Sequence, residues 1–189
     1  IRGAIELTEH PVLGETSWTN TLDNFVTAPD VVSSYAYAAS AAQAATVLRS
    51  FDLDADADGW LDSARRAWDY AEARYESEGW KEHQMGSNER LLAAVMLYRE
   101  TGESPFHQVY LQNTALRDPA AVIWAYQAQD EREASFVYAR LKGVRDVDAP
   151  AHRRSIEATL QEADAWGKTI GARSAFQWAS DPWGWFGWG

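Results

Sequence analysis

The chain has 189 residues, and its 17 basic and 28 acidic residues give a formal net charge of −11. This charge repels nucleic-acid phosphates and anionic lipid head groups, so neither nucleic acid nor a membrane surface is an expected partner. Hydrophobic residues make up 46% of the sequence, which excludes a disordered or collagen-like chain, and no run reaches the ~18 consecutive apolar residues of a membrane-spanning helix.

Helical patterns dominate from residue 30 onward. Asp30 is a suitable N-cap for a helix over 31–50 with an alanine-rich face. The clearest pattern covers 59–77, where apolar residues recur at alternating steps of three and four. A third helix is expected to start at the cap residue Asn88 and to end before Gly102, which supplies a left-handed C-terminal residue.

Four shorter helices are expected to follow. Ser104–Pro105 and Asp118–Pro119 each combine a cap residue with a proline at the first helical position. A sixth helix runs from Ala134 to a stop at Gly143, and a seventh covers about 151–168. No long strand alternation and no glycine-rich phosphate loop is present, which argues against a nucleotide-binding α/β domain.

The sequence therefore predicts an all-α protein of stacked helical hairpins. Residues 1–29 are expected to be irregular, with one short extended piece near 4–7, and the hairpins occupy 30–170. The remainder, 171–189, is predicted to form an aromatic, glycine-rich loop.

Tryptophan is unusually abundant, with ten residues, whereas cysteine is absent. The absence of cysteine excludes disulfides, thiolate metal sites and a cysteine nucleophile. Flat indole rings stack well on the C–H face of a sugar ring. The segment Trp183–Gly189 interleaves three tryptophans with glycines, so it either presents rings at a cleft or packs as a hydrophobic plug under the helices.

An acidic run precedes the second predicted helix. Asp54, Asp56 and Asp58 match the first half of a calcium-binding loop. The match fails at position twelve, where Arg65 replaces the closing acidic residue. The alternative is an acidic turn between helices in which Asp58 caps the helix that follows.

A second polar group of candidates lies in loops. Glu15 and Trp18 fall in the segment 9–18, and His83 lies just before the third helix. These residue types suit recognition of sugar hydroxyls. The alternative is that the segment 9–18 is an ordered strap on the surface with no binding role. The four histidines lack metal-ligand spacing, and no G-x-S-x-G elbow supports acyl transfer.

Several segments, taken in order, resemble the middle of a family 9 glycoside hydrolase, a cellulase-type inverting glycosidase. The matching segments are Glu9–His10–Pro11 with Gly14–Glu15–Thr16–Ser17–Trp18, Pro29–Asp30 with the alanine-rich helix, Leu61–Ala71, Asn88–Ala94 through Thr101–Gly102–Glu103, and Phe186–Gly187–Trp188–Gly189. Residues 104–182 resemble the family poorly.

This resemblance implies a periplasmic or secreted bacterial O-glycosyl hydrolase that acts on β-linked glucan or a related oligosaccharide. It also implies that the chain is a single partial domain, 1–189, forming about half of an (α/α)6 barrel. The family's water-activating aspartates and its general acid have no counterpart here, so no catalytic residue is assigned and the segment alone is expected to be inactive. Trp188, Trp18, Glu15 and His83 are the implied substrate-binding residues.

Other interpretations remain open. The chain could be a non-catalytic helical carbohydrate-binding or protein-interaction module, or a helical toroid of another class such as a sugar epimerase. No cofactor is required, and calcium is the one candidate ion. A missing barrel half would leave a hydrophobic seam, so a homodimer through that seam is expected.

Overall fold

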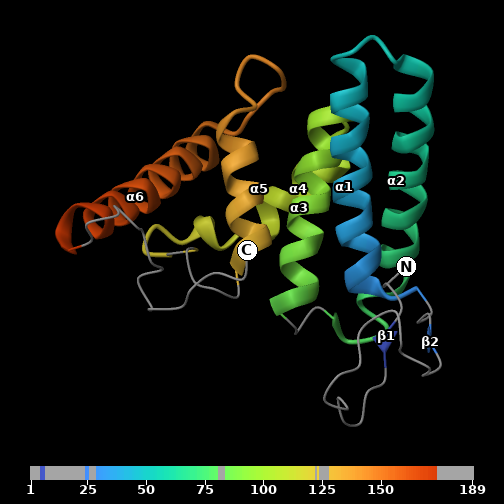
Figure 1. Cartoon of the computed structure of the whole chain (residues 1–189), viewed down its shortest axis with the longest axis horizontal. Helices are drawn as coiled ribbons and strands as arrows, with labels where there is room; N and C mark the ends of the chain where they lie inside the picture. Colours follow the sequence, from blue (N-terminus) through green and yellow to red (C-terminus); the bar gives the residue numbers. More distant parts are fainter. Residues whose placement is uncertain are drawn as a thin grey trace, which may run out of the picture.

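A computed structural model describes residues 5–6, 24–25, 29–80, 84–121, 123 and 128–173. These residues fold into six α-helices, a short 3-10 helix and a minimal antiparallel strand pair (Figure 1). The elements are β1 (Ile5–Glu6), β2 (Asn24–Phe25), α1 (Val31–Arg49), α2 (Asp54–Tyr75), α3 (Gln84–Thr101), α4 (Ser104–Asn113), η2 (Ala115–Arg117), α5 (Gln129–Ala139) and α6 (Ala149–Arg173). The expected all-α class is confirmed, and among the described helices none is long and apolar enough to cross a membrane.

The start of α1 agrees with the sequence pattern. Asp30 is extended, and its Oδ1 accepts a hydrogen bond of 2.8 Å from the backbone N–H of Ser33. A carboxylate in this position satisfies one of the amide groups left without a partner at a helix start. The alanine-rich face of α1 is buried, which lets neighbouring helices approach closely.

Several predicted helix boundaries are wrong. Helix α3 begins at Gln84, so Asn88 lies inside it and is not its cap, and α5 begins at Gln129 and not at Ala134. Helix α2 begins at Asp54, not near residue 59, because the acidic run itself forms the first turns; carboxylates are favourable there, next to the positive end of the helix dipole. Asp58 is consequently not an N-cap. At Asp118–Pro119 the described residues form a turn rather than a helix, closed by the backbone N–H of Ala120 donating to Asp118 Oδ1 at 2.8 Å.

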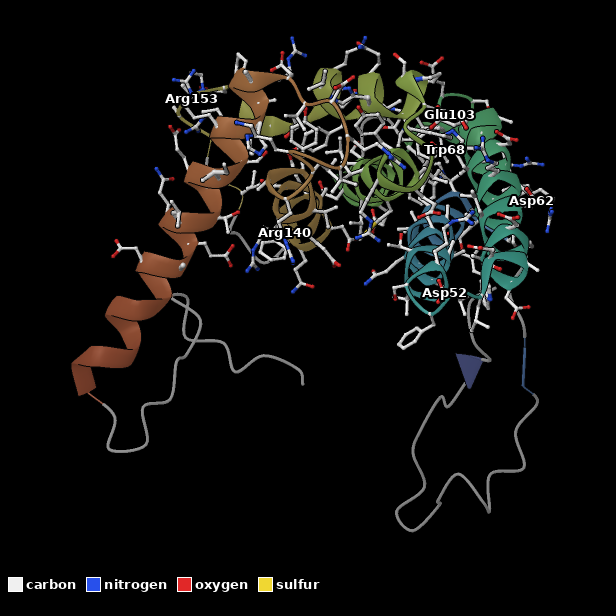
Figure 2. All side chains as sticks on the ribbon, turned by 90° about the horizontal axis from the view of Figure 1, so that it is seen from above. Asp52, Asp62, Trp68, Glu103, Arg140 and Arg153 are labelled. Atoms are coloured by element: carbon white, nitrogen blue, oxygen red, sulfur yellow. The ribbon has the colours of Figure 1, made fainter. Side chains whose placement is uncertain are left out.

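The helices form two layers. Helix α1 contacts α3 and α3 contacts α5, which makes one layer, whereas α2, α4 and α6 each pack on the helix that precedes them in the chain. Seen from above, the layers follow an arc from the α1–α2 hairpin at one edge to α6 at the other (Figure 2).

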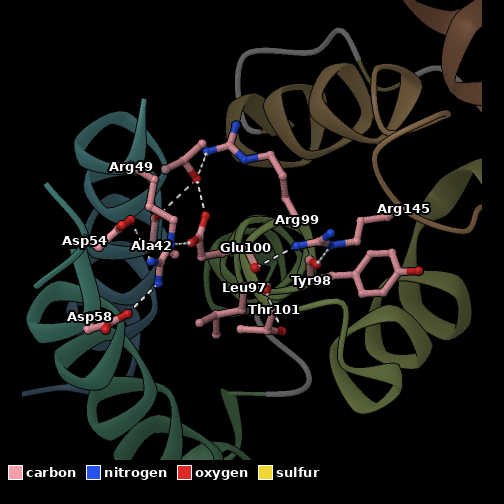
Figure 3. Close-up of polar contacts among 11 residues, drawn as sticks. Ala42, Arg49, Asp54, Asp58, Leu97, Tyr98, Arg99, Glu100, Thr101 and Arg145 are labelled. Atoms are coloured by element: carbon pink, nitrogen blue, oxygen red, sulfur yellow. Dashed lines mark hydrogen bonds and ion pairs between the residues drawn. The ribbon is translucent and has the colours of Figure 1, made fainter. Parts of the chain in front are cut away.

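The helices α1, α3 and α5 run in the same direction. At their C-terminal ends, Arg49 of α1 bonds Glu100 of α3. Arg145, in the loop after α5, donates from Nη2 to the carbonyl of Glu100 at 2.7 Å and from Nε to the carbonyl of Tyr98 at 3.3 Å (Figure 3). These contacts gather the three C-terminal ends on one side, so the three N-terminal ends lie on the other.

Aromatic rings fill the core between the layers. Trp68 of α2 packs edge-on against Tyr35 of α1, with ring centroids 5.4 Å apart, and against Phe106 of α4 at 5.3 Å. Such pairs add about 0.5–1.5 kcal/mol each to the burial of their area. The core thus ties α1, α2 and α4 together around one indole.

Two glycines provide a matched pair of variants. Gly102 has a φ of +72° and closes α3, and a Cβ there would meet Arg145, whereas Gly59 lies inside α2, where a Cβ would meet no atom within 4 Å. Gly102→Ala is expected to lower the free energy of unfolding by about 1 kcal/mol, and Gly59→Ala to raise it by about 0.5–1 kcal/mol. Urea denaturation followed by circular dichroism measures both; effects of the same sign would contradict the assignment.

Candidate functional site

The four predicted substrate-binding residues lie outside the described residues. They are Glu15, Trp18, His83 and Trp188. Their sequence positions still relate them to described helices: Glu15 and Trp18 precede α1, His83 directly precedes the first residue of α3, and Trp188 follows α6.

The predicted calcium candidates Asp54, Asp56 and Asp58 lie in the first turns of α2 and are exposed. Arg49 already supplies a positive charge there, because its guanidinium lies 3.4 Å from Asp54 Oδ1 and 2.6 Å from Asp58 Oδ1 (Figure 3). Across the described part of the chain, no three or more His, Cys, Asp or Glu side chains are grouped so that they could hold a metal ion.

A pair of acidic side chains lies at the opposite end of the layer. Glu89 of α3 is 9% exposed, and its carboxyl lies beside that of Asp130 of α5, which is half-buried. Burial, together with the neighbouring Asp130 carboxyl, raises the pKa of Glu89 to about 7. Burial also raises the pKa of Asp130. Glu89 Oε2 is buried without a hydrogen-bond partner among the described residues.

This acidic pair can hold either one shared proton or a divalent cation. Two adjacent carboxyls, one buried and one half-buried, repel each other when both are ionised, so a proton held by the pair is favoured up to about neutral pH. A divalent cation would replace that proton, and the pair would then supply two of the six to eight oxygen ligands that calcium takes. The buried Asn88 amide is next in the chain, 5% exposed. Asn88 was the predicted cap of the third helix and Glu89 lies in the matching segment Asn88–Ala94, whereas no sequence pattern pointed to Asp130.

A second polar cluster holds the start of α3 in place. Glu72 of α2 accepts a 2.5 Å hydrogen bond from the Tyr35 hydroxyl, and it also accepts two from Arg90, at 2.5 Å from Nε and 2.8 Å from Nη2. The Arg90 guanidinium also lies over the Tyr75 ring, 4.7 Å from its centroid. Because Arg90 directly follows Glu89, this cluster anchors the turn of α3 that carries Glu89.

A polar groove of about 590 Å³ borders this cluster. Its walls include Glu72, Glu76, Arg90, Gln112 and Asn113. Carboxylates and carboxamides of this kind exchange hydrogen bonds with hydroxyl-rich ligands.

No family model, curated protein or solved structure matches the chain. The fold and the site define its class as an all-α protein of consecutive helical hairpins with the acidic pair Glu89–Asp130 at one end of the first layer.

Proposed function

We propose that this chain is a segment of an (α/α)6 carbohydrate-active catalytic domain of the family 9 glycoside hydrolase type. The complete domain would act on β-linked glucan or a related oligosaccharide by an inverting, two-carboxylate mechanism, with both catalytic carboxylates outside this chain. The observation that carries the proposal is the alternation of the helices between the two layers.

That alternation has the form expected for consecutive hairpins of such a barrel. Helices α1, α3 and α5 lie side by side and parallel, and α2, α4 and α6 return on the other side (Figures 1 and 2). Three hairpins are half of the six that the proposed barrel needs, and their arc is consistent with a ring that further hairpins would close.

The proposal puts sugar binding at the N-terminal ends of α1, α3 and α5. His83 leads directly into α3, and Glu15 and Trp18 belong to the segment that leads to α1. Trp188 follows α6, in the connection toward what would be the next helix of the first layer. Loops that connect to the same end of a layer of helices can together line one binding cleft.

The acidic pair is not proposed as the catalytic pair. An inverting glycosidase holds its carboxyls roughly 6.5–9.5 Å apart so that a water molecule and the sugar fit between them. Glu89 and Asp130 are close neighbours and Glu89 is 9% exposed, so the pair does not offer the open space that a water molecule and a sugar need. Since a positioned acid or base typically contributes ~10² to 10⁴-fold to the rate, the chain alone is expected to show no hydrolysis.

Tryptophan fluorescence, titrated with cello-oligosaccharides and chito-oligosaccharides beside a sensitive hydrolysis assay, tests the proposal. A saturable shift without turnover is expected, and Trp188→Ala is expected to weaken binding by about tenfold through loss of ring stacking. Trp60→Ala, an exposed tryptophan of α2, is the matched control and should leave the affinity unchanged. Turnover by the isolated chain, or no shift with either sugar, would refute the proposal.

Calcium binding is the second part of the proposal. The acidic run Asp54, Asp56 and Asp58 and the pair Glu89–Asp130 are its two candidate sites, and the pair is the expected one because Arg49 already pairs with Asp54 and Asp58 of the run. About 1 mM calcium is expected to raise the Tm relative to EDTA in the wild type. Loss of this rise in Glu89→Gln assigns the pair, loss in Asp56→Asn assigns the run, and no rise in the wild type rejects both.

A further inference from the structure

A histidine lies where α3, α4, α5 and the α5–α6 connection meet. This connection comprises residues 140–148 (Figure 1). The ring of His107, in α4, stacks on the ring of Tyr98 in α3, with centroids 4.3 Å apart and planes 8° apart. Its Nε2 lies 2.8 Å from the hydroxyl of Tyr138 in α5. The imidazole therefore has one fixed contact on its face and one at its edge.

The Tyr138 hydroxyl also holds the end of the connection. It accepts a 2.9 Å hydrogen bond from the backbone N–H of Asp148, the residue directly before α6. Asp148 in turn caps α6, because its Oδ1 accepts a 2.9 Å hydrogen bond from the N–H of Ala151. One hydroxyl thus joins α4 and α5 to the start of α6, and we call the contact among His107, Tyr138 and Asp148 the His107 latch.

The donor in the hydrogen bond between His107 and Tyr138 follows from these contacts. Tyr138 is 0% exposed, so its hydroxyl proton needs an acceptor inside the protein. The N–H of Asp148 gives this oxygen a donor, and among the described residues the only acceptor found for its proton is Nε2 of His107. The imidazole is therefore neutral, with its own proton on Nδ1.

Protonation of the ring removes this acceptor. With a proton on Nε2, the Tyr138 hydroxyl faces two donors, and its own proton loses its partner in the core. The connection offers the charged ring other acceptors, since Asp146 and Asp148 are the charged residues that act on His107. Arg145, which lies beside them in the chain, donates to backbone carbonyls of α3. A charged ring drawn to Asp148 competes with the N–H groups that this carboxylate caps.

Burial of the ring favours the neutral form. It lowers the pKa of His107 below the ordinary 6.5, although Asp146 and Asp148 act in the opposite direction. The folded chain therefore takes up this proton at a lower pH than the unfolded chain. The stabilisation is complete above about pH 6.5, where both states are neutral, and is lost as the pH falls from there through the folded pKa.

We propose that the His107 latch is a pH-dependent device that holds the start of α6. With a neutral ring the latch is closed, and the α5–α6 connection is bound to α4 and α5; with a protonated ring it opens. Because α6 packs mainly on α5, the latch fixes how α6 leaves the rest of the molecule. The proposal does not depend on carbohydrate binding and its test uses no sugar, so its failure and that of the proposed function are distinguishable.

Hydrogen exchange of the Asp148 amide, resolved by NMR and corrected for the intrinsic rate, tests the latch. In the wild type, protection of this amide is expected to fall at least threefold between about pH 7.5 and about pH 5.5. His107→Gln keeps an acceptor oxygen that does not titrate, so its protection should be the same at both pH values. His107→Phe keeps a stacked ring without an acceptor and should lower the protection about tenfold even at the higher pH.

Another histidine of the same region supplies the control. The Nε2 of His152, in α6, lies 3.0 Å from the carbonyl of Ala139, outside the latch. His152→Gln should therefore retain the pH dependence that the Asp148 amide shows in the wild type. Circular dichroism verifies that each variant is folded.

The ring nitrogens of His107 supply a second readout that leaves the chain unaltered. Two-bond 1H–15N NMR is expected to show the ring proton on Nδ1 at about pH 7.5 and a midpoint of protonation below 6.5. A proton on Nε2 at that pH would overturn the proposal. So would wild-type protection of Asp148 that does not change with pH, a pH dependence that persists in His107→Gln, or unchanged protection in His107→Phe.

Discussion

Arg90→Ala is expected to lower the free energy of unfolding by about 2 kcal/mol, because it leaves a half-buried carboxylate at the contact of α1, α2 and α3 without its charged partner. Arg90 makes two hydrogen bonds to Glu72, and the Glu72 side chain is only 31% exposed. Without the guanidinium, the Tyr35 hydroxyl remains as the donor in the hydrogen bonds found for Glu72. Urea denaturation at pH 7, followed by tryptophan fluorescence, measures the change.

An exposed arginine of α2 is the control for this prediction. Arg74 lies 3.8 Å from Glu78 on the surface of α2, so Arg74→Ala should cost less than about 1 kcal/mol. Combining Arg90→Met with Glu72→Leu removes both charges and should recover at least half of the lost stability. Equal losses for Arg90→Ala and Arg74→Ala would show that the buried cluster contributes no more than a surface ion pair.

Glu89→Gln is expected to alter how stability depends on pH. The pKa of Glu89 in the folded chain, about 7, is higher than the ordinary value of 4.5, so between these two values the folded state holds a proton that the unfolded state releases. The stabilisation is complete below about pH 4.5, decreases as the pH rises through 7 and is absent above it. For this one group the difference amounts to about 3 kcal/mol.

The measurement is urea denaturation of both proteins from pH 5 to pH 8, in EDTA so that no cation replaces the proton. Relative to the wild type, Glu89→Gln should gain stability steadily up to about pH 7 and then remain parallel to it. Glu133→Gln, a neutral replacement at an exposed position on α5, is the control and should give a curve parallel to that of the wild type throughout. Parallel curves for Glu89→Gln and the wild type would contradict the predicted proton uptake.

Local helix features could be predicted from the sequence because each depends on a few neighbouring residues. The Asp30 cap, the buried alanines of α1 and the left-handed Gly102 at the end of α3 all appear in the structure. The predicted apolar stripe of α2 is also confirmed, because Ala64 and Trp68 are buried as the spacing indicated.

Predictions failed where one short signal had competing meanings. An acidic residue before a helical pattern can be a cap or can belong to the helix itself. Helix α2 starts at Asp54 with Asp54 and Asp56 in its first turn, so Asp58 lies inside the helix. An Asp–Pro pair starts either a helix or a turn, and residues 118–121 form a turn. Nothing in the flanking sequence distinguishes these outcomes.

The sequence by itself determined the helical class and the net charge, because these follow from composition and from periodicity along one segment. The tertiary structure alone decided that α1, α3 and α5 lie parallel in one layer, and that Glu89 meets Asp130 across two of them. It also decided that Tyr138 joins His107 to the start of α6. Each of these features depends on which helices become neighbours, and that choice is made by packing between segments far apart in the chain.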